Sequence, residues 1–327
     1  MSEPSLSTLF HSPLGPAMVR FIQYKRACGC KYHAQVAALR RFDRFLQQYH
    51  PQADRLSTEV IASWGARRAH ERASNQCGRM SVIRQLALFL RRCGQEASLP
   101  ATNWRAADFT AYTPFIYTRE QIARLLAAAE RTRPSNTSPL LHLAVPAIFH
   151  LLYGCGLRLG EALALRVRDV DLESGVLTLL DAKFGKDRLV PVAPSVLERL
   201  RQFAGAAGER PGESIFFASP LGGRYPQVSI YHQFRRLLRE IGIPHGGKGQ
   251  GPRLHDLRHT FAVHRLEQWY RQGENLGAKL PVLSTYMGHC SLVGTQRYLR
   301  LTPAIFPDIQ RRLDEQFGQI VPQGDQP

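Results

Sequence analysis

Four side chains that can act on a phosphodiester lie close together near the C-terminal end of the sequence, in residues 252–298. His255 and Arg258 are three residues apart, His289 follows a glycine, and Tyr298 lies nine residues beyond His289. Arginine and histidine can bind a phosphate, and a phenol can attack it. A phenol with a pKa near 10 is only about 0.1% ionised at pH 7, so Tyr298 needs a base or a strongly positive pocket. The set predicts phosphodiester chemistry without a metal, if the fold brings these residues together.

A second arginine, Arg158, lies in a glycine-bounded turn three residues before Glu161. A guanidinium group stays charged and binds two phosphate oxygens at once, so two arginines make a strong phosphate pocket. Losing one such donor costs on the order of 3 kcal/mol, a hundredfold or more in rate. Each residue also has an ordinary structural explanation: Arg158 as a helix cap or a partner of Glu161, His255 and His289 as helix-terminus residues, and Tyr298 as core. Only the order and spacing of the whole set favour a site.

Metal and nucleotide sites are not expected. His255, His259 and His264 share one stretch, but neither an HExxH pattern nor a carboxylate partner accompanies them,. The glycine-rich loop at 245–251 lacks the GxxxxGK[ST] pattern of a P-loop,. We therefore predict no cofactor.

The charge balance indicates a polyanionic partner. The 327 residues include 43 Lys and Arg against 26 Asp and Glu, a formal net charge of +17 with a pI near 10.1. Residues 1–115 hold 16 basic and 7 acidic side chains (+9), and the remainder holds 27 and 19 (+8). Because both parts are positive, a clamp on nucleic acid fits better than one basic tail. The alternative is a basic enzyme with no such partner.

Cysteine usage and hydropathy point to a reduced compartment. The six cysteines lack paired CxxC spacing, and the start of the chain shows no export signal,. No apolar run approaches the roughly 20 residues of a membrane span. We expect a cytoplasmic protein that does not associate with membranes.

The helical and strand patterns predict an α+β protein that is mainly α with a small antiparallel β-sheet. Four helical patterns fill the first hundred residues, and their arginine-rich faces are either solvated surface or, as the net charge favours, DNA contacts (Arg67, Arg68, Arg72, Arg79, Arg84, Arg91, Arg92). We expect a loose N-terminus, a helical DNA-clamp domain, a linker, a catalytic domain and a tail, at 1–12, 13–99, 100–116, 117–318 and 319–327.

The second domain is expected to open with a capping box at 118–121 and to contain a hairpin. Its strands are predicted at 176–180 and 188–192, with Lys183 and Lys186 near the tip,. A third short strand is predicted at 215–217. Pro281 is expected to open a late helix, and the apolar stripe beyond Pro307 predicts a last helix that needs a partner, in this subunit or another,.

Four segments together resemble the tyrosine recombinase (phage-integrase, Xer-like) family, in that family's order. They are Gly156-Leu-Arg158-Leu-Gly-Glu161, His255-Asp-Leu-Arg258-His-Thr-Phe-Ala, Tyr286-Met-Gly-His289 and Tyr298. The resemblance covers about residues 118–317. The helical region at 14–94 is similar to the family's SAM-like core-binding domain.

The resemblance implies a role for each site residue. Arg158 and Arg258 bind the scissile phosphate, His289 donates to it, and His255 is a general base or proton shuttle. Tyr298 becomes a 3′-phosphotyrosine, and Glu161 positions the Arg158 turn. Lys183 falls where the family places the lysine that protonates the leaving 5′ oxygen. Here Ala182 and Phe184 replace the glycines that flank this lysine in the family, so Lys186 remains an alternative candidate for the general acid.

The resemblance also implies the activity: a site-specific recombinase of the integrase or transposase type, acting on double-stranded DNA as a dimer per site and a tetramer in synapsis. The 31 residues from Arg258 to His289 exceed the spacing of compact Xer-like members, with the extra residues falling at 269–279. This addition, expected to be a loop, resembles versions found in mobile elements. Two alternatives stay open: type IB topoisomerase-like DNA relaxation, and a catalytically silent DNA-binding protein.

Overall fold

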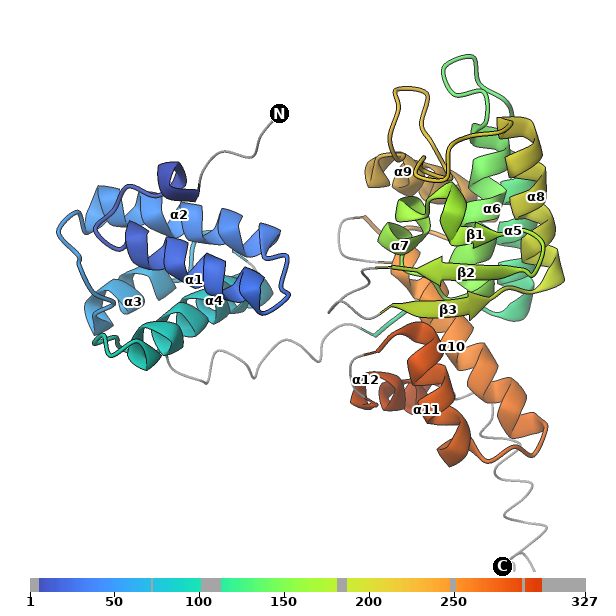
Figure 1. Ribbon diagram of the computed structural model, residues 1–327. Coiled ribbons are helices and arrows are strands. Elements are labelled where there is room, and N and C mark those ends of the chain that lie inside the picture. The colour runs from blue at the N-terminus through green and yellow to red at the C-terminus, as the bar shows by residue number, and fades with distance from the viewer. Residues whose placement is uncertain are drawn as a thin grey trace, which may run out of the picture. The chain divides into compact units, whose positions relative to one another are not determined.

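A computed structural model describes residues 6–71, 73–100, 113–180, 187–247, 251–289 and 292–301. The chain forms two compact units, Met1–Thr113 and Pro114–Pro327, each with its own buried apolar residues (Figure 1). Apart from one three-stranded antiparallel sheet in the second unit, the regular elements of the described residues are helices. The predicted fold class, mainly α with a small antiparallel sheet, is confirmed. Within the described residues, no helix combines the length and hydropathy that a membrane span requires.

The first unit is a helical bundle built on an aromatic core. Phe21, Phe42, Trp64 and Leu86 are all almost fully buried in it. The side chain of Ser57 caps the third helix by accepting a hydrogen bond from the backbone N–H of Val60,. Its helices are α1 (Gly15–Ala27), α2 (His33–Tyr49), α3 (Thr58–Gly65) and α4 (Ala73–Arg92).

One arginine of this unit is used inside the fold. The guanidinium of Arg79 donates to the carbonyl oxygens of Trp64 and Ala66 and pairs with the carboxylate of Glu71 at 2.8 Å. Its side chain is only 7% exposed. The expectation that Arg79 is solvated or touches DNA is therefore wrong, because these bonds commit its charge to joining α4 to the end of α3. Arg72 lies outside the described residues.

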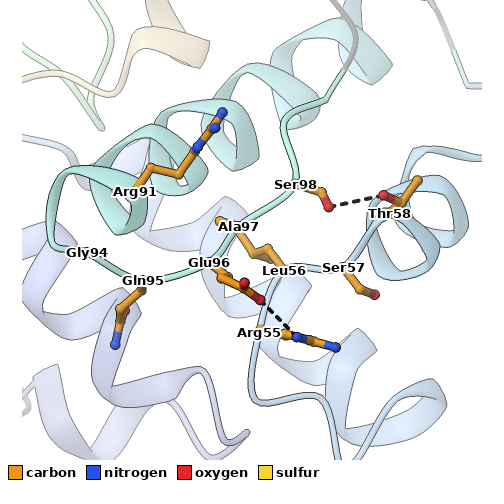
Figure 2. Close-up of a pocket in the computed structure, with 10 residues that line it drawn as sticks. All are labelled: Arg55, Leu56, Ser57, Thr58, Arg91, Gly94, Gln95, Glu96, Ala97 and Ser98. Atoms are coloured by element: carbon orange, nitrogen blue, oxygen red, sulfur yellow. Dashed lines mark hydrogen bonds and ion pairs between the residues drawn. The ribbon is translucent and has the colours of Figure 1, made fainter.

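A polar hollow of about 610 Å³ lies where the segment after α4 runs beside the segment before α3 (Figure 2). A parallel bridge joins Leu56 to Ala97, and the hydroxyls of Thr58 and Ser98 are 3.0 Å apart. The sequence did not indicate this pairing, because the two segments lie about forty residues apart and are joined by a single isolated bridge.

The second unit packs its sheet among helices around a second core. The strands run in the order β1-β2-β3, with Val170 opposite Leu177 and Val176 opposite Pro191. Its regular elements up to the sheet are α5 (Arg119–Glu130), α6 (Leu141–Gly154), α7 (Leu159–Ala164), a 3₁₀ turn η3 (Val167–Asp169), β1 (Val170–Asp171), β2 (Val176–Leu179) and β3 (Arg188–Pro191). The elements that follow are α8 (Pro194–Ala207), α9 (Gln227–Glu240), α10 (Leu254–Arg271), α11 (Leu276–Met287), α12 (Val293–Gln296) and a 3₁₀ helix η4 (Arg297–Leu301).

Helix α10 is the central element of this unit, because it contacts α6, α11 and η4. Apolar residues on one side of it, such as Phe261 and Leu266, form a cluster with Leu283 and Tyr298 from the elements that follow. Its N-terminus is closed by Asp256, whose carboxylate accepts from the backbone N–H of Arg253 at 2.8 Å. These contacts fix the position of α10, and therefore the points from which its side chains extend.

Three expectations about secondary structure are corrected. Residues 215–217 form no strand; Ile215 makes an isolated bridge to Arg166, and the third strand is the two-residue β1. Pro281 lies inside α11, which begins five residues earlier where Asn275 caps it. The expected loop at 269–279 is mostly helical, because α10 continues to Arg271 and α11 starts at Leu276. A strand as short as β1 carries no periodicity, and a proline is tolerated where neighbouring packing offsets one lost hydrogen bond. The helix predicted beyond Pro307 lies outside the described residues.

Candidate active site

Arg158 lies at the N-terminus of α7, in a turn that only glycine permits. Gly156 has φ +60°, and a Cβ atom there would come within 2.5 Å of the Phe261 ring,. After the turn, the carboxylate of Glu161 accepts a hydrogen bond from the backbone N–H of Arg158 at 2.9 Å. The glycine turn and this hydrogen bond therefore fix the backbone position of Arg158.

Glu161 is a carboxylate shared by two guanidinium groups. Arg158 Nη1 donates to its Oε1 at 2.6 Å, and Arg188 donates from Nη1 and Nη2 at 3.2 and 2.9 Å. Burial of Glu161 opposes its ionisation, but the hydrogen bonds from Arg188 and from the Arg158 backbone outweigh this and lower the pKa to about 2,. Glu161 is therefore an anion that holds two cations in fixed positions.

Arg258 is a fully buried guanidinium that joins two distant turns. It is 1% exposed, and it donates to the carbonyl oxygens of Gly156 and Met287, each at 2.6 Å. Burial, followed by repulsion from Arg158, lowers its pKa to about 10, which still leaves it charged at neutral pH. The bonds tie the Arg158 turn, the C-terminus of α11 and α10 into one site.

The C-terminus of α11 is the meeting point of three guanidinium groups. Arg158 Nη2 donates to the Gly288 carbonyl at 3.2 Å, and Arg188 Nε donates to the Tyr286 carbonyl at 3.0 Å. Together with the Arg258 bond to Met287, these donors satisfy the carbonyl oxygens that a helix end leaves unpaired. Gly288 has φ +65°, and a Cβ atom on it would lie 2.7 Å from Arg188 Nη1. The close packing of cations here requires glycine.

The two histidines of the expected set lie in this positive environment. His255 is partly exposed to solvent. Even so, burial, followed by the charges of Arg258 and Arg158, lowers its pKa to about 4. Burial, then Arg258 and Arg158, lowers the pKa of His289 to about 4 as well. Both imidazoles are therefore neutral at pH 7. His289 Nδ1 is hydrogen-bonded to the Thr295 hydroxyl at 2.7 Å.

Tyr298 lies on η4 and is 2% exposed. Its hydroxyl is hydrogen-bonded to Nδ1 of His259 at 3.0 Å, and its ring stacks on His289 at a centroid distance of 6.0 Å. The charge of its phenolate form would raise the pKa of Arg258, so the hydroxyl lies within electrostatic reach of that guanidinium.

The structure thus brings together six residues that the sequence singled out: Arg158, Glu161, His255, Arg258, His289 and Tyr298. Lys183 and Lys186 lie outside the described residues. The sequence patterns did not indicate a role for Arg188, whose only signal was its place at the start of β3, two residues after Lys186. His259 was considered only as a metal ligand.

The described residues hold no group of three or more His, Cys, Asp or Glu placed to bind a metal ion. The three histidines of α10 have different surroundings. His255 and His259 touch edge to face at a ring-centroid distance of 4.7 Å, and His259 also meets Tyr298. The buried His264 instead meets Tyr153, with its Nδ1 3.0 Å from the tyrosine hydroxyl.

Comparison with known proteins identifies the family to which this geometry belongs. Residues 116–304 match the phage integrase family. The chain is 33% identical over 309 residues to a protein of Sinorhizobium fredii designated integrase/recombinase y4rB, covering 92% of this chain and 97% of that protein. It is 30% identical to tyrosine recombinase XerC of Chromobacterium violaceum, covering 87% of this chain and 90% of the relative.

Solved structures share the fold at lower identity. The integrase of the Tn1549 transposon in complex with transposon right-end DNA matches with a TM-score of 0.63 at 16% identity, covering 95% of this chain and 99% of that one. The XerH recombinase in a post-cleavage complex with its palindromic difH substrate matches with a TM-score of 0.60 at 16% identity, covering 86% and 77%.

The Glu161 network generates a prediction about stability. The pKa shift from 4.5 to about 2 corresponds to roughly 3 kcal/mol. This contribution is complete above pH 4.5 and is lost as the pH falls toward 2, because the depressed pKa belongs to the folded state. We expect Glu161→Gln to lower the free energy of unfolding by about 3 kcal/mol at pH 7 and by clearly less at pH 3, measured by urea denaturation.

Glu213 provides the matched control. It pairs with two arginines, Arg166 and Arg168, but it is 61% exposed, so Glu213→Gln should cost no more than about 1 kcal/mol. A loss for Glu161→Gln that is equal at pH 7 and pH 3 would show that the carboxylate charge is not what stabilises the turn.

Proposed function

The chain belongs to the phage integrase family and is a tyrosine recombinase, and we propose that Tyr298 cuts and rejoins DNA under the control of Arg158 and Arg258. The protein is a DNA breaking-rejoining enzyme acting on specific sites. The finer assignment, an integrase or transposase of a mobile element, is supported by the extended α10–α11 region and by the likeness to the Tn1549 integrase fold.

The observation that carries this proposal is the convergence of two guanidinium groups beside one phenol. The bonds named above engage two of the five N–H donors of Arg158 and two of those of Arg258,. We assign their remaining donors to the oxygens of the scissile phosphate. Because the arginines are already fixed by protein contacts, they stabilise developing charge without reorganising during the reaction.

In the proposed reaction, Tyr298 Oη attacks the scissile phosphorus and forms a 3′-phosphotyrosine. The bond from phosphorus to the 5′ oxygen breaks, and that oxygen leaves as a hydroxyl after receiving a proton. The phosphotyrosine retains the energy of the broken linkage, so the reverse attack by a 5′ hydroxyl rejoins DNA without ATP. A metal is not part of this scheme, because the guanidinium groups supply the positive charge.

The neutral imidazoles fit roles at the phosphate. The anion of a bound phosphodiester opposes the repulsion that lowers the pKa of His255 and His289,. We propose that His289 donates a hydrogen bond to the phosphate and that His255 serves as proton shuttle. Glu161 acts by holding Arg158. Lys183 protonates the leaving 5′ oxygen, with Lys186 as the competing candidate.

Double-stranded DNA is the proposed partner. Positive charge on both units, +9 and +8, suits a protein that holds a duplex from two sides,. We further propose a dimer on each site and a tetramer in synapsis, with the segment beyond Pro307 donated to a neighbouring subunit. We also propose that the protein acts in the cytoplasm, because its six cysteines lack paired CxxC spacing,.

The nucleophile is tested with a suicide duplex, nicked beside the cleavage position, that carries a site selected from random DNA by the wild-type chain. We expect a covalent protein–DNA adduct with the wild type and none with Tyr298→Phe. Tyr153→Phe is the control, because Tyr153 makes a similar histidine contact outside the site; it should keep the adduct. Adduct from Tyr298→Phe would refute the assignment. Supercoil relaxation without recombinant products from two sites would favour the topoisomerase alternative.

The general acid is tested by comparing Lys183→Ala with Lys186→Ala on the same duplex. We expect Lys183→Ala to lower the cleavage rate about a hundredfold or more, because the 5′ alkoxide then leaves without a proton. Lys186→Ala should stay within about tenfold of the wild type. The opposite order of the two rates would move the acid to Lys186.

The subunit exchange is tested by deleting residues 304–327. We expect the shortened chain to bind one site as before but to lose synapsis and recombination of two sites, measured by gel shift and by product formation. Normal recombination by the shortened chain would refute the exchange.

A further inference from the structure

The hydroxyl of Tyr298 has a defined partner within the protein. It lies 3.0 Å from Nδ1 of His259, and the two ring centroids are 5.5 Å apart. Both residues are buried, at 2% and 7% exposure. The family resemblance gives His259 no role, and His255 is the histidine it presents as base.

The surroundings of this pair are basic and aromatic. On α10, His255 meets the His259 ring edge to face at a centroid distance of 4.7 Å, and the charged Arg258 directly precedes His259. From the segment after α11, His289 stacks on the Tyr298 ring and is hydrogen-bonded to Thr295. Helix α6 contains no Asp or Glu, and its Tyr153 pairs with His264, five residues further along α10.

We propose that His259, not His255, takes the proton from Tyr298 when it attacks the phosphate. This proposal rests on the function assigned above and names the base of that reaction. The O–H bond of Tyr298 breaks, its proton moves to Nδ1 of His259, and the oxygen electron pair forms the bond to phosphorus. In rejoining, the imidazolium of His259 returns the proton as Tyr298 leaves, so neither direction needs a co-reactant.

Geometry favours His259 over His255. A general base must lie within about 2.6–3.2 Å of the atom that loses its proton, and the His259 contact with the nucleophile oxygen meets this condition. Burial, followed by the charges of Arg258 and Arg158, lowers the pKa of His255 to about 4, which makes it a weak proton acceptor before DNA binds. His255 is in edge contact with His259. It is then placed either to act on the phosphate or to pass on the proton that His259 accepts.

The test measures single-turnover adduct formation from pH 6 to 9, using the nicked suicide duplex with the selected site. In His259→Asn, the side-chain amide lies near the position of Nδ1 and can keep the contact with Tyr298, but it cannot take up a proton. We expect its rate to fall about a hundredfold or more at pH 7. The deficit should shrink about tenfold per pH unit as hydroxide replaces the base.

His264→Asn is the matched control, because His264 lies on the same helix, is also 7% exposed and contacts a tyrosine hydroxyl through Nδ1 at 3.0 Å. It should keep the wild-type profile and a rate within about threefold. A His259→Asn profile parallel to that of the wild type, or a rate close to it, would overturn the proposal by leaving His259 a structural role.

A second measurement needs no DNA and separates this proposal from the function on which it rests. Histidine ¹⁵N NMR of the full chain at pH 7.5 should show His259 with Nδ1 unprotonated and Nε2 protonated, and with an Nδ1 shift that changes in Tyr298→Phe. A proton on Nδ1 would overturn the proposal, since His259 would then donate to the tyrosine oxygen. Absence of any adduct from the wild-type chain would instead refute the proposed function.

Discussion

A single buried guanidinium holds the catalytic unit of this protein in its working arrangement. Arg258 bonds to the carbonyl oxygens of Gly156 and Met287, two residues that precede and follow α10 in the sequence. Burying a charge without partners costs several kcal/mol, so this arginine is stable only when both turns are in place. The same requirement brings Arg158, His289 and Tyr298 next to it. Folding and assembly of the site are therefore one event.

The second constraint is the shared carboxylate of Glu161. It places Arg158 and Arg188 on the same anion, and both arginines also bond to the C-terminus of α11. The carbonyl oxygens at that helix end accept hydrogen bonds from the guanidinium groups and favour their charged form,. A site with this much fixed positive charge and neutral histidines is ready for an anion. Arg188 is the first residue of β3, so the same network anchors the start of this strand.

Sequence reasoning succeeded where chemistry leaves a local pattern. Motif order placed Arg158, Arg258, His289 and Tyr298 in one site, and period-two and helical patterns gave the fold class and the β2–β3 hairpin. The predictions were wrong where tertiary packing determines the outcome. Strand β1 is too short to show a period of two, and α11 continues through Pro281. The side chain of Arg79 is buried and forms an ion pair with Glu71 inside the fold. His259 could not be identified as the partner of Tyr298, because nothing in a sequence shows which helix face meets a residue 39 positions away. The lysine assignment and the oligomer stay predictions.

We propose that Arg258 acts on the charge of the phosphate as well as holding the fold. The most direct measurement compares Arg258→Ala with the wild type on two suicide duplexes, one with the normal scissile phosphodiester and one with an uncharged methylphosphonate there. If the claim is right, the variant loses a hundredfold or more on the phosphodiester but stays within about tenfold of the wild type on the methylphosphonate. An equal loss on both duplexes would contradict it, because Arg258 would then serve the fold alone.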